Sequence, residues 1–509
     1  MIRREFLLLS AASLAALNAC STVSKRHASA LPAGLDWPQL QSQLRGELLL
    51  PEHAEFSRLA KAANARYDHK IPAAIIRCAN SQDVQLCVNF IRQHQLPFAI
   101  RGGGHSYTGF SSSHGLLLDL GLMQQIRLDG QLASIGAGAK LGDVYASLGR
   151  DGRSIPAGSC VSVGIAGLTL GGGLGIADRR FGLTCDALQS VEIVTADGVI
   201  RQCSRSQHAD LFWALRGGGG GQFGIVTELV FQTFATGPIR NYIGRYPLSA
   251  GEKVLTGWQG WLGQLPDSVW SQATIWFSGD ILREPEIQIR ACAMDEPALL
   301  TQHWQQLALQ LSEVWSELDM QDHHYLDFML TDCDGMEMPQ CKLPNQNPQG
   351  QLKRVAMAGS SDIFNQAIPT QGITRLLQAI RQRHQQGGRG GVMLTAMGGA
   401  IQKLPHHDSA FAHRRALLSA QYLMSGPVGS PEPLMADGAR WVNQMRSVMK
   451  SWSSGGAYLN YTDALLKDWP SAYYGDHYAR LQQIKTLYDA GQLFQGRQHI
   501  QPATLSRQR

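Results

Sequence analysis

The stretch Arg101-Gly102-Gly103-Gly104-His105-Ser106 decides the fold of this chain, together with Ala157-Gly158-Ser159-Cys160 further along. Glycines let backbone N–H groups approach a pyrophosphate closely, and the histidine at the end of the loop adds a nitrogen nucleophile. Cysteine, set between glycine-rich runs, adds a soft sulfur nucleophile. The two segments together indicate a cofactor that is held at two covalent points.

The residues before the glycine loop predict how it is placed. An apolar strand is expected over 71–78, and Ser81 is expected to cap a helix with the apolar stripe Val84, Cys87, Val88 and Ile91. Phe98-Ala99-Ile100 then predicts a second strand that runs straight into the loop. This order delivers the loop at the end of a sheet, a normal place for a cofactor phosphate.

A flavin offers two positions for such nucleophiles, its 8α-methyl carbon and its ring carbon C6. The chain resembles the berberine-bridge-enzyme-like flavoproteins of the vanillyl-alcohol-oxidase superfamily in both segments and in 163–175, 211–221 and 458–463. The resemblance runs from about Arg66 to Pro502 and is strongest before Val226 and after Ala457. It implies an α+β fold, with a two-part PCMH-type FAD-binding domain and an antiparallel-sheet substrate domain.

A chain of 509 residues is too long for one core, so several parts are expected. The expected parts are a signal peptide at 1–20, a tether and N-terminal segment at 21–66, the FAD-binding domain at 67–237, the substrate domain at 238–452, and a C-terminal segment at 453–509 that returns to the FAD domain.

The resemblance implies FAD bound covalently through both His105 and Cys160. The alternatives are a loop histidine without a special role and a buried structural thiol. Further cofactor contacts are expected from the glycine-rich segments and their neighbours, although the glycines could also serve only as tight turns at a sheet edge. These residues are Arg101, Gly102, Gly103, Gly104, Ser106, Val163, Gly164, Gly167, Gly171, Gly172, Gly173, Gly175, Gly221, Ile225, Val226 and Tyr461.

Tyr458 and Asn460 are the candidate catalytic residues. They stand two apart, so on a strand both would point to one face, which the resemblance turns towards the flavin. Tyr458 would accept the substrate hydroxyl proton as a hydride goes to flavin N5, with Asn460 holding it in place. A free tyrosine has a pKa of about 10, so the site would have to lower it. The alternative is a tyrosine that only packs.

The resemblance also bears on the electron acceptor. Val163 matches the position that gates oxygen in the family, where valine goes with oxidases, whereas Leu168 replaces a histidine found in many plant relatives. The expected function is an oxidase that oxidises an alcohol or hemiacetal carbon and passes the electrons to O₂, giving H₂O₂. The alternatives are a covalent-flavin dehydrogenase with a quinone-type acceptor and a non-catalytic, lipid-anchored binding protein.

A stretch with alternating side chains suggests the substrate. Trp270, Gln272, Thr274 and Trp276 would share one face of a strand and present two flat apolar plates with polar groups between them. Sugar rings stack on such plates, which favours a carbohydrate. The alternative is that these tryptophans pack against helices behind the sheet.

Other classes of site are not favoured. Gly219-x-Gly221-x-x-Gly224 matches a dinucleotide motif, but a strand follows it where a helix is required. The cluster Asp322-His323-His324 with Asp327 predicts no metal, because neighbouring histidines cannot share one strand or helix face. A net charge of +5 without a basic block argues against nucleic acid.

The N-terminus predicts export. Arg3-Arg4 precede a short apolar run, and Leu17-Asn18-Ala19-Cys20 resembles a lipoprotein processing site. The order Arg-Arg-x-Phe-Leu also resembles a twin-arginine signal, with Ile2 in place of the usual serine. We therefore expect a periplasmic or envelope protein, anchored in the membrane only by a lipid on Cys20. The seven cysteines other than Cys20 and Cys160 cannot all pair, so most are expected to be small buried hydrophobes.

Overall fold

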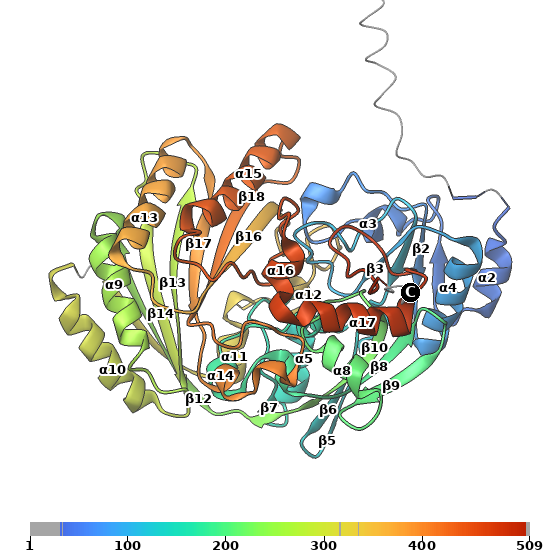
Figure 1. The fold of residues 1–509 in the computed structure, drawn as a ribbon, viewed down its shortest axis with the longest axis horizontal. Coiled ribbons are helices and arrows are strands. Elements are labelled where there is room, and N and C mark those ends of the chain that lie inside the picture. Colours follow the sequence, from blue (N-terminus) through green and yellow to red (C-terminus); the bar gives the residue numbers. More distant parts are fainter. Residues whose placement is uncertain (1–30, 33, 315–316, 334, 505–509) are drawn as a thin grey trace, which may run out of the picture.

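The computed structural model describes residues 31–504 except 33, 315–316 and 334, so the expected signal peptide and Cys20 lie outside the described part. The chain forms two bodies that lie side by side (Figure 1). One holds two smaller sheets together with the C-terminal helices, and the other holds a seven-stranded sheet with helices on its outer face. This arrangement confirms the expected α+β class.

The first body contains a mixed sheet in the order β1-β2-β4-β3 and an antiparallel sheet in the order β5-β6-β10-β8-β9, with β7 paired to β11. Its strands are β1 Glu47–Leu49, β2 Ala74–Arg77, β3 Phe98–Arg101, β4 Leu116–Asp119, β5 Ile126–Asp129, β6 Leu132–Gly136, β7 Arg153–Ser154, β8 Leu188–Thr195, β9 Ile200–Ser204, β10 Gly224–Gln232 and β11 Phe234–Ala235. Its helices are α2 Trp37–Gln43, α3 Phe56–Ala60, α4 Ser81–His94, α5 Leu141–Gly149, α6 Ile165–Leu170, α7 Asp178–Phe181, α8 Ala209–Leu215, α16 Trp469–Tyr474 and α17 Tyr478–Asp489.

The order of strand, helix and strand before the glycine loop is confirmed. The α4 stripe at Val84, Cys87, Val88 and Ile91 is completely buried, and β3 ends at Arg101. The expected cap at Ser81 is wrong. The side chain of Asn80 accepts the Asp83 N–H at 2.9 Å, and Ser81 is the first helical residue.

The first sheet starts earlier than the expected domain boundary at residue 67. Strand β1 pairs antiparallel with β2, and Leu40 and Leu44 belong to the same core as α4. The Asp83 carboxylate accepts backbone N–H bonds from Arg45 and Gly46, which fastens this segment to the start of α4. The part of the chain just before residue 67 is therefore built into the first body.

The second body is one antiparallel sheet in the order β15-β12-β14-β13-β17-β18-β16. Helices α9, α10, α13 and α15 cover its outer face (Figure 1). Its strands are β12 Pro238–Pro247, β13 Val269–Ser278, β14 Glu286–Met294, β15 Glu317–His324, β16 Ala356–Phe364, β17 Arg389–Ala396 and β18 Leu418–Gly426. Its helices are α9 Gly251–Leu262, α10 Pro297–Gln310, α11 Tyr325–Met329, α12 Met338–Lys342, α13 Thr370–Gln385, α14 Ala400–Lys403 and α15 Glu432–Met449.

The expected pair of tryptophan plates on β13 is wrong. Trp270 is only 6% exposed and belongs to the core of the first body, whereas Trp276, at the other end of the same face, is 46% exposed. The opposite face of β13, which carries Val269 and Ala273, packs against the helices. The expected alternative is therefore also wrong, because Trp270 faces the first body and not the helices.

The C-terminal residues return to the first body. Leu481 and Ile484 of α17 share its core with Ile225 of β10, far away in sequence.

The described cysteines other than Cys160 are all buried, as expected, but Cys333 and Cys341 form a disulfide that the count of cysteines did not predict. Among the described residues, no helix is long and apolar enough to cross a membrane.

Candidate active site

Two glycine-rich segments meet backbone to backbone at the end of β3. A Cβ on Gly103 would lie 2.1 Å from the Gly164 backbone N, and one on Gly164 would lie 2.3 Å from the Gly103 N. The segment before Gly164 is fixed in turn, since the Leu141 N–H donates to the Val163 carbonyl at 2.9 Å. Only glycine fits at either contact, and the contact brings the His105 loop against the Cys160 segment.

His105 lies beside the segment that carries the cysteine. Its Nε2 is 3.0 Å from the Ser162 hydroxyl oxygen. Burial, with a smaller contribution from nearby Lys140, lowers the pKa of His105 to about 4. The imidazole is therefore neutral at neutral pH, as a nitrogen nucleophile must be.

Cys160 is exposed, so the alternative of a buried structural thiol is wrong. Its thiol lies close to Tyr107, whose pKa is raised first by burial and then by the neighbouring cysteine. Tyr107 in turn stacks on Tyr461 at a ring-centroid distance of 6.1 Å. The exposed sulfur, the neutral imidazole and this aromatic pair thus belong to one small region.

Tyr458 and Asn460 come together, but not in the way expected. The chain around them is a turn and not a strand, so the argument from a shared strand face is wrong. The Asn460 side-chain amide instead folds back and donates to the Tyr458 Oη at 2.8 Å, and it also donates to the Leu168 carbonyl at 2.9 Å. That carbonyl can only accept, which fixes the orientation of the amide.

Tyr458 is almost fully buried, and its hydroxyl oxygen accepts three hydrogen bonds. Besides Asn460, the donors are the backbone N–H groups of Gly173 at 2.9 Å and Leu174 at 3.1 Å. Burial raises the pKa of Tyr458, while these three donors oppose that shift because they stabilise the deprotonated oxygen. Donors of the expected kind are present, but the net shift is upward.

The glycine run 171–175 packs closely against other parts of the protein. A Cβ on Gly171 would meet the Asn460 Oδ1 at 2.1 Å, and one on Gly173 would meet Thr184 at the same distance. Gly172 faces Phe411, and Gly175 faces the Ala157 carbonyl. The run shapes the surroundings of the Tyr458 hydroxyl.

Other expected cofactor residues fall into two groups. The Arg101 guanidinium is buried and donates to the carbonyls of residues 59, 60, 61 and 111, so its side chain is committed to protein. Ile225 and Val226 are buried within β10. By contrast, a Cβ on Gly167 would meet nothing within 4 Å. Cβ atoms on Gly104 and Gly221 would stand at ordinary contact distances of 3.6 Å and 3.4 Å, and one on Gly102 would lie 3.2 Å from the Ala137 carbonyl. Ser106 is half-buried and its hydroxyl accepts the Phe110 N–H at 3.1 Å.

The contacts that assemble the site join segments far apart in sequence, and sequence reasoning missed them. The Thr108 hydroxyl donates to Thr462 at 3.1 Å, and Gln421 of β18 donates to the Tyr107 hydroxyl at 2.7 Å. Asp463, expected at most to cap a helix, is buried and accepts from Ser360 of β16 at 2.7 Å. None of these pairs leaves a local pattern that could have revealed it.

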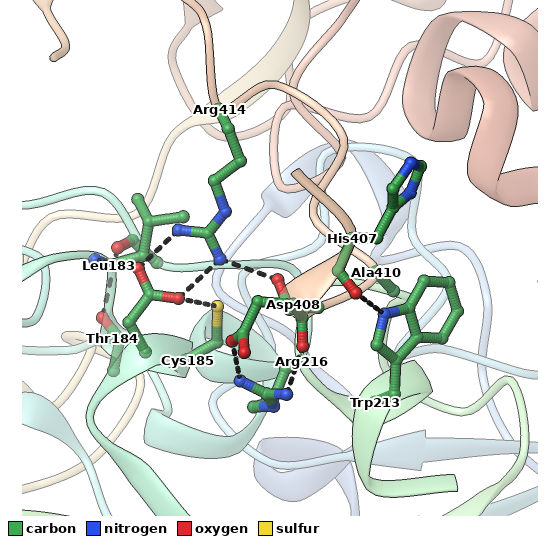
Figure 2. A network of polar contacts seen from close by, with 12 residues as sticks. Leu183, Thr184, Cys185, Trp213, Arg216, His407, Asp408, Ala410 and Arg414 are labelled. Atoms are coloured by element: carbon green, nitrogen blue, oxygen red, sulfur yellow. Dashed lines mark hydrogen bonds and ion pairs between the residues drawn. The ribbon is translucent and has the colours of Figure 1, made fainter. Parts of the chain in front are cut away.

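A polar network ties the segment from His407 to Arg414 to the first body (Figure 2). Arg414 pairs with Asp186 through two contacts of 2.6 Å, and Arg216 pairs with Asp408 at 2.7 Å. The Trp213 indole donates to the His407 carbonyl at 2.8 Å. This network fixes the segment 406–414, which carries the Phe411 ring towards Tyr458.

These residues fit a flavin nucleotide. The open space beside Gly167 leaves room for a ligand at the glycine-rich backbone, and the donor set of one neutral imidazole and one exposed thiol suits covalent attachment. Site and fold together define an FAD-dependent oxidoreductase with a flavin domain that is split in sequence.

Comparisons with known proteins agree with this class. The family described as "FAD binding domain" matches residues 72–204, and the family described as "Berberine and berberine like" matches residues 457–501. The FAD-linked oxidoreductase YgaK of Bacillus subtilis is 30% identical over 91% of this chain and 98% of its own length. The chain therefore belongs to the berberine-bridge-enzyme-like FAD-linked oxidoreductases, and it is an enzyme and not a non-catalytic binding protein.

More distant relatives share the fold. A chitooligosaccharide oxidase of Gibberella zeae is 27% identical over 89% of this chain and 92% of its own length. The structure of the Physcomitrella patens BBE-like 1 protein superposes with a TM-score of 0.80 at 24% identity, covering 92% of this chain and 99% of the other. A xylooligosaccharide oxidase from Myceliophthora thermophila, in complex with xylobiose, gives 0.80 at 23% identity with the same coverage. The PCMH-type fold with its antiparallel-sheet domain is thereby confirmed.

Proposed function

We propose that this enzyme oxidises an alcohol or hemiacetal carbon, with Tyr458 as the base and FAD held covalently by His105 and Cys160. FAD held by these residues would supply a hydride acceptor. Tyr458 accepts the substrate hydroxyl proton, and Asn460 holds the phenol oxygen in place. The remaining residues of the site position these groups.

The observation that carries this proposal is the set of three donors on the Tyr458 hydroxyl. A tyrosine that only packs needs at most one or two partners, whereas three N–H groups aimed at one oxygen stabilise it after it has lost its proton. The donors are two backbone groups and a fixed amide, so they do not reorganise during the reaction. This is the geometry of a base that must carry charge briefly in a buried place.

Tyr458→Phe tests the role of the base. We expect kcat/KM to fall by about 10²–10⁴-fold, because positioned proton transfer contributes about that much. The raised pKa of Tyr458 means that the phenol is protonated at neutral pH, so wild-type kcat/KM should rise as pH increases. Asn460→Ala removes one donor and should move that rise to higher pH. Tyr488→Phe, whose hydroxyl bonds Asp210 on α8, is the matched control. A wild-type rate in Tyr458→Phe would reject the base.

We propose O₂ as the electron acceptor, giving H₂O₂. Val163 supports this, because its partly buried side chain lies beside the contact between Gly103 and Gly164 and is small. Val163→Leu should slow oxygen uptake roughly tenfold or more while leaving dye-coupled oxidation of substrate nearly unchanged. If both rates stay equal to wild type, Val163 is not the oxygen gate. Wild-type flavin that stays reduced in air after substrate is added would instead favour the alternative of a dehydrogenase with a quinone-type acceptor.

The substrate is proposed to be a carbohydrate. Two relatives are named for oligosaccharides, and Trp276 offers one exposed indole on the face of β13 that also carries Gln272. An aromatic face with polar groups beside it suits a sugar ring. Release of H₂O₂ from a panel of oligosaccharides and phenolic alcohols would separate this class from others.

We also propose that the protein is exported and anchored by a lipid on Cys20. The disulfide between Cys333 and Cys341 supports a place outside the cytoplasm, because disulfides persist in oxidising compartments.

A further inference from the structure

A cluster of metal-ligating side chains lies outside the flavin site. His406 and His407 come from the short 3₁₀ turn η6 (His406–Asp408), and Asp476 and His477 come from η7 (Gly475–His477). One ligand atom from each of the four lies within 4.8 Å of all the others. The two pairs are 70 residues apart in sequence, and the fold alone brings them together.

The distances suit a small tetrahedral ion. The His406 Nε2 is 3.0 Å from the Asp476 Oδ1, the His407 Nδ1 is 3.1 Å from the His477 Nε2, and the His477 Nε2 is 3.8 Å from the Asp476 Oδ1. Ligand atoms on a tetrahedral Zn²⁺ with bonds of 2.0–2.1 Å stand about 3.3 Å apart. These three separations fall on both sides of that value, and all ligand atoms lie within 4.8 Å of one another, so an ion requires the side chains to draw together around it.

The protonation of His477 leaves a lone pair for a metal. Its Nδ1 faces the Ala410 carbonyl at 3.3 Å, and a carbonyl can only accept, so Nδ1 carries the proton and Nε2 is bare. A ring N–H bonded to a backbone carbonyl is the usual support of a metal-binding histidine. His406 lacks such a support, because its Nδ1 is buried with no hydrogen-bond partner among the described residues, and it meets the cluster through Nε2.

The argument against neighbouring histidine ligands does not apply here. On β15, His323 and His324 point to opposite faces of the strand. On the tight turn η6, the rings of His406 and His407 are 4.5 Å and 5.1 Å from the His477 ring, so both reach the same partner. In the structure His406 pairs with Asp476, and the His407 Nδ1 donates to the bare His477 Nε2 at 3.1 Å, so a bound ion would take the place of the proton between these two rings.

We propose that His406, His407, Asp476 and His477 form a binding site for a divalent transition-metal ion, Zn²⁺ being the best match. Three imidazole nitrogens and one carboxylate are ligands that Zn²⁺ takes in tetrahedral geometry. The site joins η6 to η7. Because η6 precedes Phe411, which faces Tyr458, and η7 follows α16, the ion fastens the C-terminal segment to the wall of the flavin site.

The test uses the tag-free holoenzyme in a Cys160→Ala background, which removes an exposed thiol as a competing ligand. After treatment with a chelator, the protein is titrated with ZnCl₂ alone, and zinc content and thermal unfolding are measured. We expect about one Zn²⁺ per chain and a higher Tm with zinc, with weaker binding at pH 5 because protons compete for the imidazoles.

Variants separate this site from others. His407→Ala and Asp476→Asn lie at exposed positions and should lower zinc affinity roughly tenfold or more, and should remove the zinc-dependent rise in Tm. His323→Ala, at a half-buried histidine outside the cluster, should change neither. Zinc binding that is absent in the parent protein, or that is unchanged in both cluster variants, would overturn the proposal.

Discussion

One hydrogen bond at His105 decides which ring nitrogen is available. Nε2 is occupied by the Ser162 hydroxyl at 3.0 Å, so Nδ1 is the nitrogen left for a bond to the cofactor. The low pKa, about 4, keeps the imidazole neutral across the neutral range, and Nδ1 is the bare nitrogen in the tautomer whose Nε2 donates its proton to Ser162. The close contact between Gly103 and Gly164 holds the ring next to the segment of Cys160.

This arrangement makes attachment at two points testable. His105→Ala and Cys160→Ala should each keep yellow cofactor on the protein after acid precipitation, because one covalent bond remains. The double variant should release all of it. Absorbance of the precipitated and redissolved protein measures the outcome, with His323→Ala as the control. Colour retained by the double variant would show that neither residue is the attachment point.

Tyr458 shows where reasoning from single residues fails. The spacing of Tyr458 and Asn460 predicted that they act together, and they do touch. The predicted reason, a shared strand face, is wrong, because the segment is a turn. Two of the three donors come from Gly173 and Leu174, which are 285 and 284 residues away in sequence. No spacing rule reaches that far.

At the scale of elements, β13 shows how one strand serves two different surroundings. The alternation of its side chains between two faces was predicted. The neighbouring elements, however, decide which end of each face is buried. Trp270 lies against the first body, whereas Trp276 lies over Gly391 of β17, where a Cβ would come within 2.5 Å of the indole. The glycine lets the exposed ring lie flat against the sheet, which leaves its outer face open.

If Trp276 is part of the substrate cleft, Trp276→Ala should raise KM for an oligosaccharide roughly tenfold and change kcat little. Stacking is made in the ground state and the transition state alike, so its loss weakens binding more than catalysis. Steady-state kinetics with Leu282→Ala, an exposed residue in the turn after β13, provide the control. A loss of kcat with unchanged KM would argue against stacking.

At the scale of the whole molecule, residues from both ends of the described chain share the core of the flavin domain. The C-terminal segment carries Tyr458 and is tied to the sheet body by Asp463, which accepts from Ser360 and Asn443 at 2.7 Å each. The base is therefore placed by the junction of the two bodies.

The location of the whole protein leads to a separate prediction. Cys20→Ser should shift the enzyme from the membrane fraction to the soluble fraction of the cell envelope without changing its specific activity, because only the anchor is lost. Activity assays on separated fractions measure this, and Ser21→Ala is the matched control. An unchanged membrane fraction in Cys20→Ser would reject the lipid anchor.

The sequence by itself determined the features that depend on neighbouring residues. The apolar stripe of α4, the strand β3 that ends at the glycine loop, and the strand after Gly224 were predicted, because turn geometry and side-chain periodicity act over a few residues. Only the tertiary structure decided the three donors on Tyr458, the burial of Trp270, the disulfide at Cys333, and the approach of His407 to His477. Those contacts join segments whose meeting depends on how whole sheets and helices pack, and packing leaves no local pattern in the chain.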